Sequence, residues 1–224
     1  MPTRSRFPPP EQHRCYRPRG HAGACNQYPY LQHLRKVAAK VAKKIERDSI
    51  MTTGASWKSE DAGPNRIRRW AMLLTDEALL EMGLDMGKLK PVIVAKLREK
   101  AATYDDCMAV AKRLTALAYG MQSSPEMPED IRAYLEALFG PITRGTTTCL
   151  VCREPLDFTL FGEARRGKAA IETSHSNPRL HAPDNVGFAH RACNIAQGNK
   201  TLDEFYSWIS GILERVGFEV SRRS

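Results

Sequence analysis

The sequence predicts an α+β fold, with a mainly helical part over residues 1–145 and a small module of short strands and helices over 146–224. Three observations support this prediction. Apolar residues recur at helical spacing through much of the stretch 31–139. Gly140 and Pro141 then interrupt the helical pattern. After them come two closely spaced pairs of Cys and His residues, which is typical of a small metal-stabilised module.

Composition limits the class of protein. The 224 residues are 42% hydrophobic and 26% charged, as in an ordinary globular chain, so neither wholesale disorder nor a collagen-like structure is expected. No apolar run approaches the length that crosses a membrane. The first twenty residues have no apolar core of the secretory type, so we expect the cytoplasm, where clustered cysteines more often hold metal than form disulfides.

Positive charge is concentrated at the start of the chain. The net charge is +9, and residues 1–48 hold 11 Lys or Arg against 3 acids, a net charge of +8. An asymmetry of this kind favours a nucleic-acid partner. The alternative is a solvated basic face that has no partner.

The N-terminal 29 residues contain three consecutive prolines and several arginines, which predicts an extended arm. Four residues of this arm could form a second metal site, although their spacing is irregular; otherwise they belong to a flexible DNA-binding arm. They are His13, Cys15, His21 and Cys25.

A basic amphipathic helix is expected to follow the arm. Its apolar stripe consists of Leu31, Leu34, Val37, Val41 and Ile45. Its basic residues lie mainly off that stripe: Lys36, Lys40, Lys43, Lys44 and Arg47. Such a helix suits either contact with a phosphate backbone or packing with the lysines in water.

Four more helices are expected in the first part, at 64–82 with Gly83 as the stop, and at 88–101, 104–119 and 127–139. Cys107 stands alone within an apolar pattern and is interpreted as a small buried hydrophobic residue.

The last third changes character. A strand or turn is expected at 155–161 and a strand at about 168–174, followed by a polar loop and a short helix near 190–197. Thr201 and Glu204 form a capping box, which predicts the start of a final helix.

The two ligand pairs are Cys149 with Cys152 and His190 with Cys193. Three thiolates and an imidazole are soft donors that suit a structural, tetrahedral zinc ion (Zn²⁺). The alternative is that the cysteines are simply buried thiols and that His190 is a surface or catalytic histidine.

The stretch between these pairs carries a more specific pattern. It reads Glu172-Thr-Ser-His175-Ser-Asn-Pro178, then Asn185, then Asn194 directly after Cys193. This pattern resembles the HNH endonuclease family, whose ββα-metal core carries His-x-x-Pro after a strand and a later Asn, and whose zinc-containing members include restriction-type enzymes. The resemblance covers about residues 146–205.

The resemblance implies roles for three residues. His175 would be the general base that takes a proton from the attacking water. Asn185 would hold the histidine in position, and Asn194 would offer a carbonyl oxygen to a catalytic divalent cation such as Mg²⁺.

One position departs from the family pattern. The residue before the general base is usually an Asp or His that binds the metal, and here it is Ser174. Glu172 lies two residues earlier and, by strand alternation, on the same face, so its carboxylate could replace the missing ligand. The alternative is a site that has lost its metal and only binds DNA.

From the resemblance we expect a sequence-specific, restriction-type endonuclease acting on double-stranded DNA. Residues 1–145 would be a basic arm and helical DNA-binding domain, and 146–224 the HNH nuclease module with a C-terminal helix. A homodimer is expected because cutting both strands needs two active sites. The alternatives are a phage or mobile-element nicking enzyme and an inactive zinc-containing DNA-binding module. His181, Arg191 and Lys200 have no counterpart in the pattern. His181 could contact phosphate or the metal, and Arg191 and Lys200 could contact phosphates, but we interpret them as an ordinary loop histidine and isolated surface charges.

Overall fold

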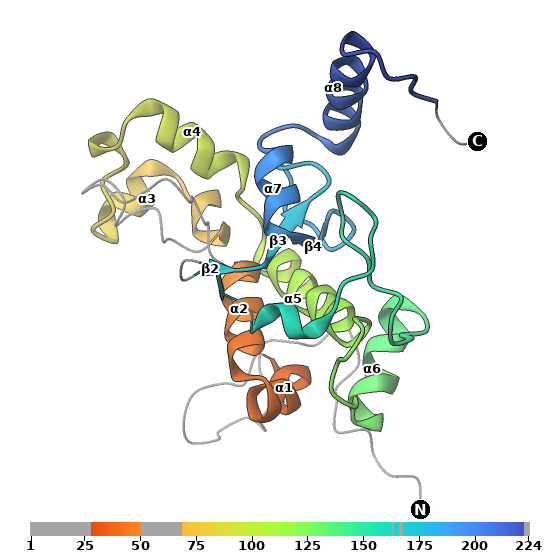
Figure 1. Ribbon diagram of the computed structural model, residues 1–224. Coiled ribbons are helices and arrows are strands. Elements are labelled where there is room, and N and C mark those ends of the chain that lie inside the picture. The colour runs from red at the N-terminus through yellow and green to blue at the C-terminus, as the bar shows by residue number, and fades with distance from the viewer. Residues whose placement is uncertain (1–27, 51–68, 163, 166–167, 222–224) are drawn as a thin grey trace, which may run out of the picture.

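The computed structural model describes residues 28–50, 69–162, 164–165 and 168–221. Helices α1 to α6 form the first part, and a two-stranded sheet with α7 follows (Figure 1). This arrangement confirms the mixed α+β class. The N-terminal arm, including its candidate metal ligands at 13, 15, 21 and 25, lies outside the described residues. None of the described helices is long and apolar enough to cross a membrane.

Helix α5 (Tyr104–Tyr119) lies at the centre of the fold and has the predicted bounds. Its first turn is closed by a capping box: Asp106 N donates to Thr103 Oγ1 at 3.1 Å, and Thr103 N donates to the Asp106 carboxylate at 3.3 Å. Cys107 is fully buried in the core, as predicted.

The predicted helix over 31–47 is divided in two. A 3₁₀ turn (Pro29–Leu31) leads into α1 (Gln32–Val37), and α2 (Ala39–Ile50) begins after Ala38, whose φ of −150° and ψ of 59° are not helical. The break turns Val37 away from the core, and this residue is 54% exposed to solvent. The prediction of a single apolar stripe that includes Val37 is therefore wrong, whereas Leu34, Val41 and Ile45 are buried as predicted.

The helix expected over 64–82 is also not continuous among the described residues. A 3₁₀ segment (Arg69–Leu73) is followed by α3 (Asp76–Glu81), because the Thr75 hydroxyl accepts a hydrogen bond from Ala78 N at 3.3 Å and caps a new helix. Gly83 ends α3 with a φ of +82°, as its stop position predicted.

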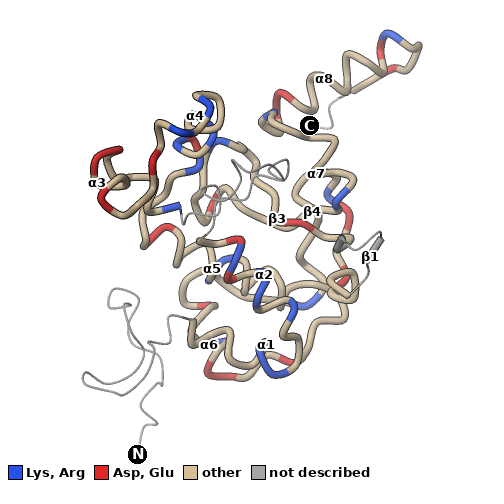
Figure 2. Tube along the Cα trace, turned by 90° about the vertical axis from the view of Figure 1, so that its left-hand side faces the viewer, with Lys and Arg blue, Asp and Glu red and all other residues tan. Residues whose placement is uncertain are grey.

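Helices α3 and α4 (Pro91–Glu99) enclose a small second core with the 3₁₀ turn Met86–Lys88. Acidic residues gather along α3 and basic residues along α4 (Figure 2). Helix α6 (Glu129–Phe139) packs against α5 and ends at Gly140, whose φ is +77°.

The C-terminal module contains a short hairpin followed by a helix. Strands β3 (Ile171–His175) and β4 (Val186–His190) pair antiparallel with Ile171 opposite His190, and α7 (Arg191–Gln197) follows directly. Strand β4 was not expected. The segment predicted as strand or turn at 155–161 ends in a 3₁₀ turn (Phe158–Phe161). The strand expected at 168–174 is divided into β2 (Lys168–Ala169) and β3. Strand β2 pairs with β1 (Ala164–Arg165).

The main apolar core crosses residue 145 without interruption, since Leu114 of α5 and Phe188 of β4 belong to the same buried cluster. The division into two parts at that residue stays a prediction. Helix α8 (Leu202–Arg215) opens with the predicted capping box at Thr201 and Glu204 and projects from the body of the molecule (Figure 1).

Candidate functional site

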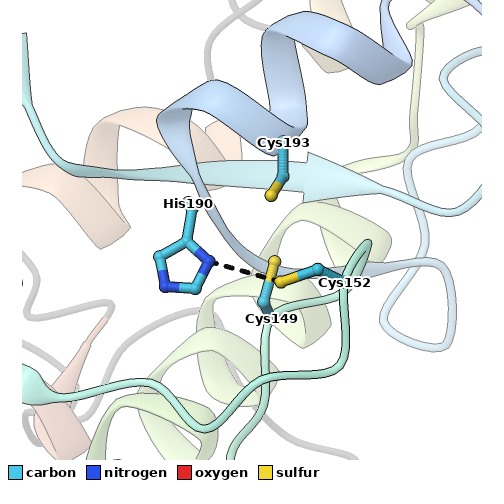
Figure 3. Close-up of side chains that lie close together, drawn as sticks. All are labelled: Cys149, Cys152, His190 and Cys193. Carbon is cyan, nitrogen blue, oxygen red and sulfur yellow. Dashed lines mark hydrogen bonds between the residues drawn. The ribbon is translucent and has the colours of Figure 1, made fainter.

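The four predicted metal ligands come together. Cys149 and Cys152 lie in a tight turn in which Arg153 N donates to Cys149 O at 3.0 Å, and Leu150 N donates to Phe188 O on β4 at 2.9 Å. These bonds hold the turn against the strand that ends at His190, one turn of chain before Cys193 (Figure 3).

The geometry of this cluster fits a tetrahedral metal ion. The three Sγ atoms and one ring nitrogen of His190 all lie within 4.8 Å of one another, and Cys152 Sγ is 3.5 Å from His190 Nδ1 (Figure 3). Zinc–sulfur bonds of about 2.3 Å place neighbouring ligand atoms roughly 3.5–4 Å apart, so small side-chain movements would complete the site. The chain thus contains a possible Cys₃His metal site.

A second group of residues lines a cleft of about 460 Å³ between the end of α2, the Arg69 turn, the end of α4 and the edge formed by β3 and α7. It contains three residues predicted from the sequence, together with others that were not. Its lining includes Asp48, Arg69, Lys100, Glu172, His175 and Asn194.

Glu172 and Asn194 are direct neighbours in this cleft. Asn194 Nδ2 donates to Glu172 Oε2 at 2.8 Å, while Arg191 forms an ion pair with Glu172 Oε1. None of the described residues donates a hydrogen bond to the side-chain carbonyl oxygen of Asn194, so this oxygen can accept a hydrogen bond or ligate a cation. Arg191, interpreted from the sequence as a simple surface charge, therefore contacts the candidate metal ligand.

Ser174 is not part of the cleft lining. It is 1% exposed, and its hydroxyl donates to Gln197 Oε1 on α7 at 3.1 Å. Ser174 and Glu172 both face α7, because alternate residues of a strand share a face. Ser174 thus packs β3 against α7, and of these two residues Glu172 is the one that offers a carboxylate to the cleft.

His175 contacts a second histidine that the sequence pattern did not assign. Its Nε2 lies 3.0 Å from His181 Nδ1, and His181 Nε2 lies 2.8 Å from the backbone oxygen of Ser49. His181 is 5% exposed, so the interpretation as an ordinary loop residue was wrong. No local pattern indicates this contact, because Ser49 lies 132 residues away in the sequence.

This chain of contacts assigns the ring protons. A carbonyl oxygen only accepts, so His181 Nε2 must carry a proton and His181 Nδ1 a lone pair. His175 Nε2 then donates to it, which leaves His175 Nδ1 unprotonated. Burial, followed by the positive charge of Arg69, lowers the pKa of His181 to about 3. Burial, with the neighbouring His181 and Arg69, also holds the pKa of His175 well below 6.5.

Asn185 fixes the chain that follows His175. Its Oδ1 accepts from Asn177 N at 2.8 Å and from the Ser176 hydroxyl at 2.6 Å. Its Nδ2 donates at 2.8 Å to the backbone oxygens of Asn177 and Leu180. These four bonds define the loop that brings His181 back to His175.

The end of α2 joins the helical part to the cleft. Asp48 is 6% exposed, and its carboxylate accepts hydrogen bonds at 2.7–2.8 Å from Lys44, Arg47 and Thr173. Burial alone would raise the pKa of this carboxyl, but the Lys44 and Arg47 charges outweigh it and the pKa of Asp48 is lowered. Asp48 is therefore an anion that ties α2 to β3.

The family model named DraIII matches residues 27–193. The chain belongs to the DraIII family. The matched range of this DraIII-family chain ends at Cys193 and takes in α1 to α6, Arg69, His175 and all four Cys₃His residues.

A solved structure described as a type II restriction endonuclease is 44% identical to the DraIII-family chain. The similarity covers 92% of this chain and 95% of that one, with a TM-score of 0.77. No curated protein matches. The family and this neighbour support a restriction-type endonuclease, the class of enzyme that the sequence predicted.

Proposed function

We propose that the chain is a type II restriction endonuclease that hydrolyses phosphodiester bonds in double-stranded DNA. The reaction would occur in the cleft between α2, β3 and α7, within an HNH-type ββα core. The observation that carries this proposal is the arrangement of His175, which is partly buried and neutral and lies in the same cleft as Glu172 and Asn194. Its Nε2 contacts His181, while its Nδ1 forms no hydrogen bond with any residue that the structure describes.

His175 would act as the general base through Nδ1. The attacking water oxygen forms a bond to phosphorus, its proton passes to Nδ1, and the P–O bond to the leaving oxygen breaks. Because the pKa of His175 is held low, the ring is neutral at physiological pH, and its Nδ1 lone pair is available to the proton of the attacking water. The hydrogen bond from its Nε2 to His181 keeps the ring in the required tautomer.

Glu172 and the amide oxygen of Asn194 would hold the divalent cation, since carboxylate and carbonyl oxygens are the ligands that Mg²⁺ prefers. Such a cation supplies positive charge to the phosphate and to the leaving oxygen. Arg191 now occupies one Glu172 oxygen, so its guanidinium has to move or share that carboxylate when the cation binds. Ser174 is committed to Gln197 and is not proposed as a ligand.

Cys149, Cys152, His190 and Cys193 would hold a structural zinc ion that joins the turn before the sheet to α7. The ββα unit alone is small, and metal binding would supply part of its folding free energy. The helical part and its basic arm would bind the DNA. We further propose a homodimer, in which each subunit cuts one strand.

The test incubates supercoiled plasmid with the protein and Mg²⁺, alongside His175→Ala and the control His33→Ala. His33 bonds Tyr119 in the helical part and is not among the residues that line the cleft. We expect discrete linear fragments from the wild type and from His33→Ala, and a rate lowered by about 10²–10⁴ for His175→Ala. Open circles alone would mean nicking, and intact plasmid would contradict the proposal.

A further inference from the structure

The cleft has an excess of positive charge that its own acids do not neutralise. Five basic residues line it, and its two acids are already paired, Asp48 with Lys44 and Arg47, and Glu172 with Arg191. Among the described residues, no ion pair is formed by the other three basic lining residues, which are Arg69, Lys96 and Lys100.

Arg69 is the most unusual of the three. Its side chain is 2% exposed, and its only hydrogen bond within the described part of the chain is a long one of 3.4 Å from Nη2 to Asp48 O. The Nε and Nη1 donors are buried without a partner among those residues. A buried guanidinium with unused donors costs stability, so a fold retains it only where something else compensates.

Lys100 lines the same cleft and is close enough to Arg69 for the positive charge of Arg69 to affect it. Burial, followed by the nearby Arg69, lowers the pKa of Lys100 to about 8. The fold therefore brings a buried cation and a partly buried one into the same cleft, where they repel each other. An anion bound between them would remove this repulsion and satisfy the unused donors.

We propose that Arg69 and Lys100 bind the DNA phosphate that His175 acts on, a role for the helical part inside the active site. This inference rests on the proposed nuclease function and adds the groups that hold the substrate. A phosphodiester supplies one negative charge and several acceptor oxygens, which fit a guanidinium and an ammonium in one cleft.

The end of α2 places Arg69 relative to the base. The backbone oxygen of Asp48 accepts from Arg69, and the backbone oxygen of the next residue, Ser49, accepts from His181, which in turn contacts His175. Two consecutive carbonyl groups thus position the phosphate-binding cation and the general base together.

The test measures binding of a fluorescent DNA duplex, without Mg²⁺, across a salt series for the wild type, Arg69→Met and Lys100→Gln. The control is Lys88→Gln, a lysine with an 82% exposed side chain outside the cleft. We expect both cleft variants to bind the duplex about 10- to 100-fold more weakly. Each should also flatten the slope of log K against log salt concentration by about one unit. Lys88→Gln should match the wild type.

Thermal unfolding separates this role from a structural one. If Arg69 serves a ligand, its replacement by Met removes an unpaired buried charge, so the melting temperature should stay the same or rise. A lowered melting temperature in Arg69→Met, together with unchanged DNA binding in Lys100→Gln, would overturn the proposal.

A duplex with a neutral methylphosphonate at the cleaved bond then identifies the phosphate. It should weaken binding to the wild type more than to Arg69→Met, in which only Lys100 still loses a phosphate charge; equal losses in both would place Arg69 at another phosphate and overturn the assignment to the reacting group. If the wild type binds DNA with the expected Arg69 effect but never cuts it, the nuclease proposal fails while the phosphate site stands.

Discussion

His175 Nε2 lies 3.0 Å from His181 Nδ1, six residues further along the chain. The second ring is in turn anchored to Ser49 O at the end of α2, so the helical part determines which nitrogen of His175 is free to accept a proton. Within the described part of the chain, His181 forms no hydrogen bond with the proposed metal ligands or with Arg69, and it is therefore a positioning residue rather than a catalytic one.

Replacing His181 by Ala should lower the cleavage rate by about 10- to 100-fold, the usual effect of losing the partner that orients a reactive side chain. DNA binding in the absence of Mg²⁺ should change little. His181→Asn retains an acceptor near the position of Nδ1, so it should keep more activity than the Ala variant. Single-turnover rates for both variants test this. Equal losses in Asn and Ala would indicate that His181 only fills space.

The stability of the protein should fall as the pH is lowered through about 6.5. Both histidines have folded-state pKa values below the unfolded value, because burial disfavours their charged forms. Below about pH 6.5 the unfolded chain binds protons that the folded chain does not, so the free energy of unfolding drops by up to roughly 1.4 kcal/mol per pH unit for each histidine. The full contribution is present above about pH 6.5, and the part due to His181 is lost by about pH 3.

Urea unfolding at pH 7.5, 6 and 5 would measure this dependence, with His181→Asn as the comparison. The variant keeps one of the two histidines whose pKa is lowered in the folded state, so the pH slope due to these histidines should be about half that of the wild type. Parallel slopes for the two proteins would contradict the burial of an uncharged His181.

The sequence predicted best where local chemistry determines structure. Helix α5 begins and ends at the predicted residues because Thr103 and Asp106 cap its start and Gly120 follows its last turn. The Cys₃His cluster could also be predicted, because its ligand spacing is short and its donors are chemically distinctive.

The features that the sequence could not predict depend on distant contacts. Strand β4 contains Gly187, and its pairing with β3 compensates for a weak local β preference. Arg69 and His181 read as ordinary polar residues in their own segments. They become buried parts of a site only when the end of α2 reaches the C-terminal module, and no local pattern encodes that approach.

Purified protein should contain about one zinc per chain. Cys149→Ser and Cys193→Ser should release it and unfold the C-terminal module, because the turn before the sheet and the start of α7 are joined through the proposed ion. Cys107→Ala is the matched control, since this cysteine is buried in the core but outside the cluster and should leave the zinc content unchanged.

Metal analysis of the wild type and the three variants, together with their near-ultraviolet circular dichroism spectra, tests for the structural zinc ion. Well under one zinc per wild-type chain would refute the structural ion. More than one would direct attention to the four candidate ligands in the arm: His13, Cys15, His21 and Cys25.

Glu172 should matter more for cleavage than Ser174. The carboxylate lies in the cleft beside Asn194, whereas the serine is buried and its hydroxyl is bonded to Gln197 of α7. Glu172→Gln should weaken cleavage strongly and raise the Mg²⁺ concentration needed for half-maximal rate, because it removes the negative charge that the cation requires. Ser174→Ala should change the Mg²⁺ requirement little. Mg²⁺ titrations of the cleavage rate test both variants, and the reverse ranking would place the cation at Ser174.

The last prediction concerns the lysines of α2. Lys40 and Lys43 are exposed, whereas the Lys44 side chain is 13% exposed and paired with Asp48 at 2.8 Å. Only the exposed pair is free to neutralise DNA phosphates outside the cleft. Each phosphate contact contributes roughly 0.9 to the slope of log K against log salt, so reversing the charge of both should flatten that slope by about two units.

The same double variant should bind all sequences more weakly and leave the cleavage site unchanged, because phosphate contacts carry no sequence information. Lys44→Glu should behave differently. It places two carboxylates together at the end of α2, so we expect it to lower the melting temperature before it alters the salt slope. Anisotropy titrations over a salt series, with melting curves for each variant, distinguish the two effects. An unaltered slope in the double variant would mean that these lysines only solvate the outer face of α2, and a changed cleavage site would place that helix in a groove of the DNA.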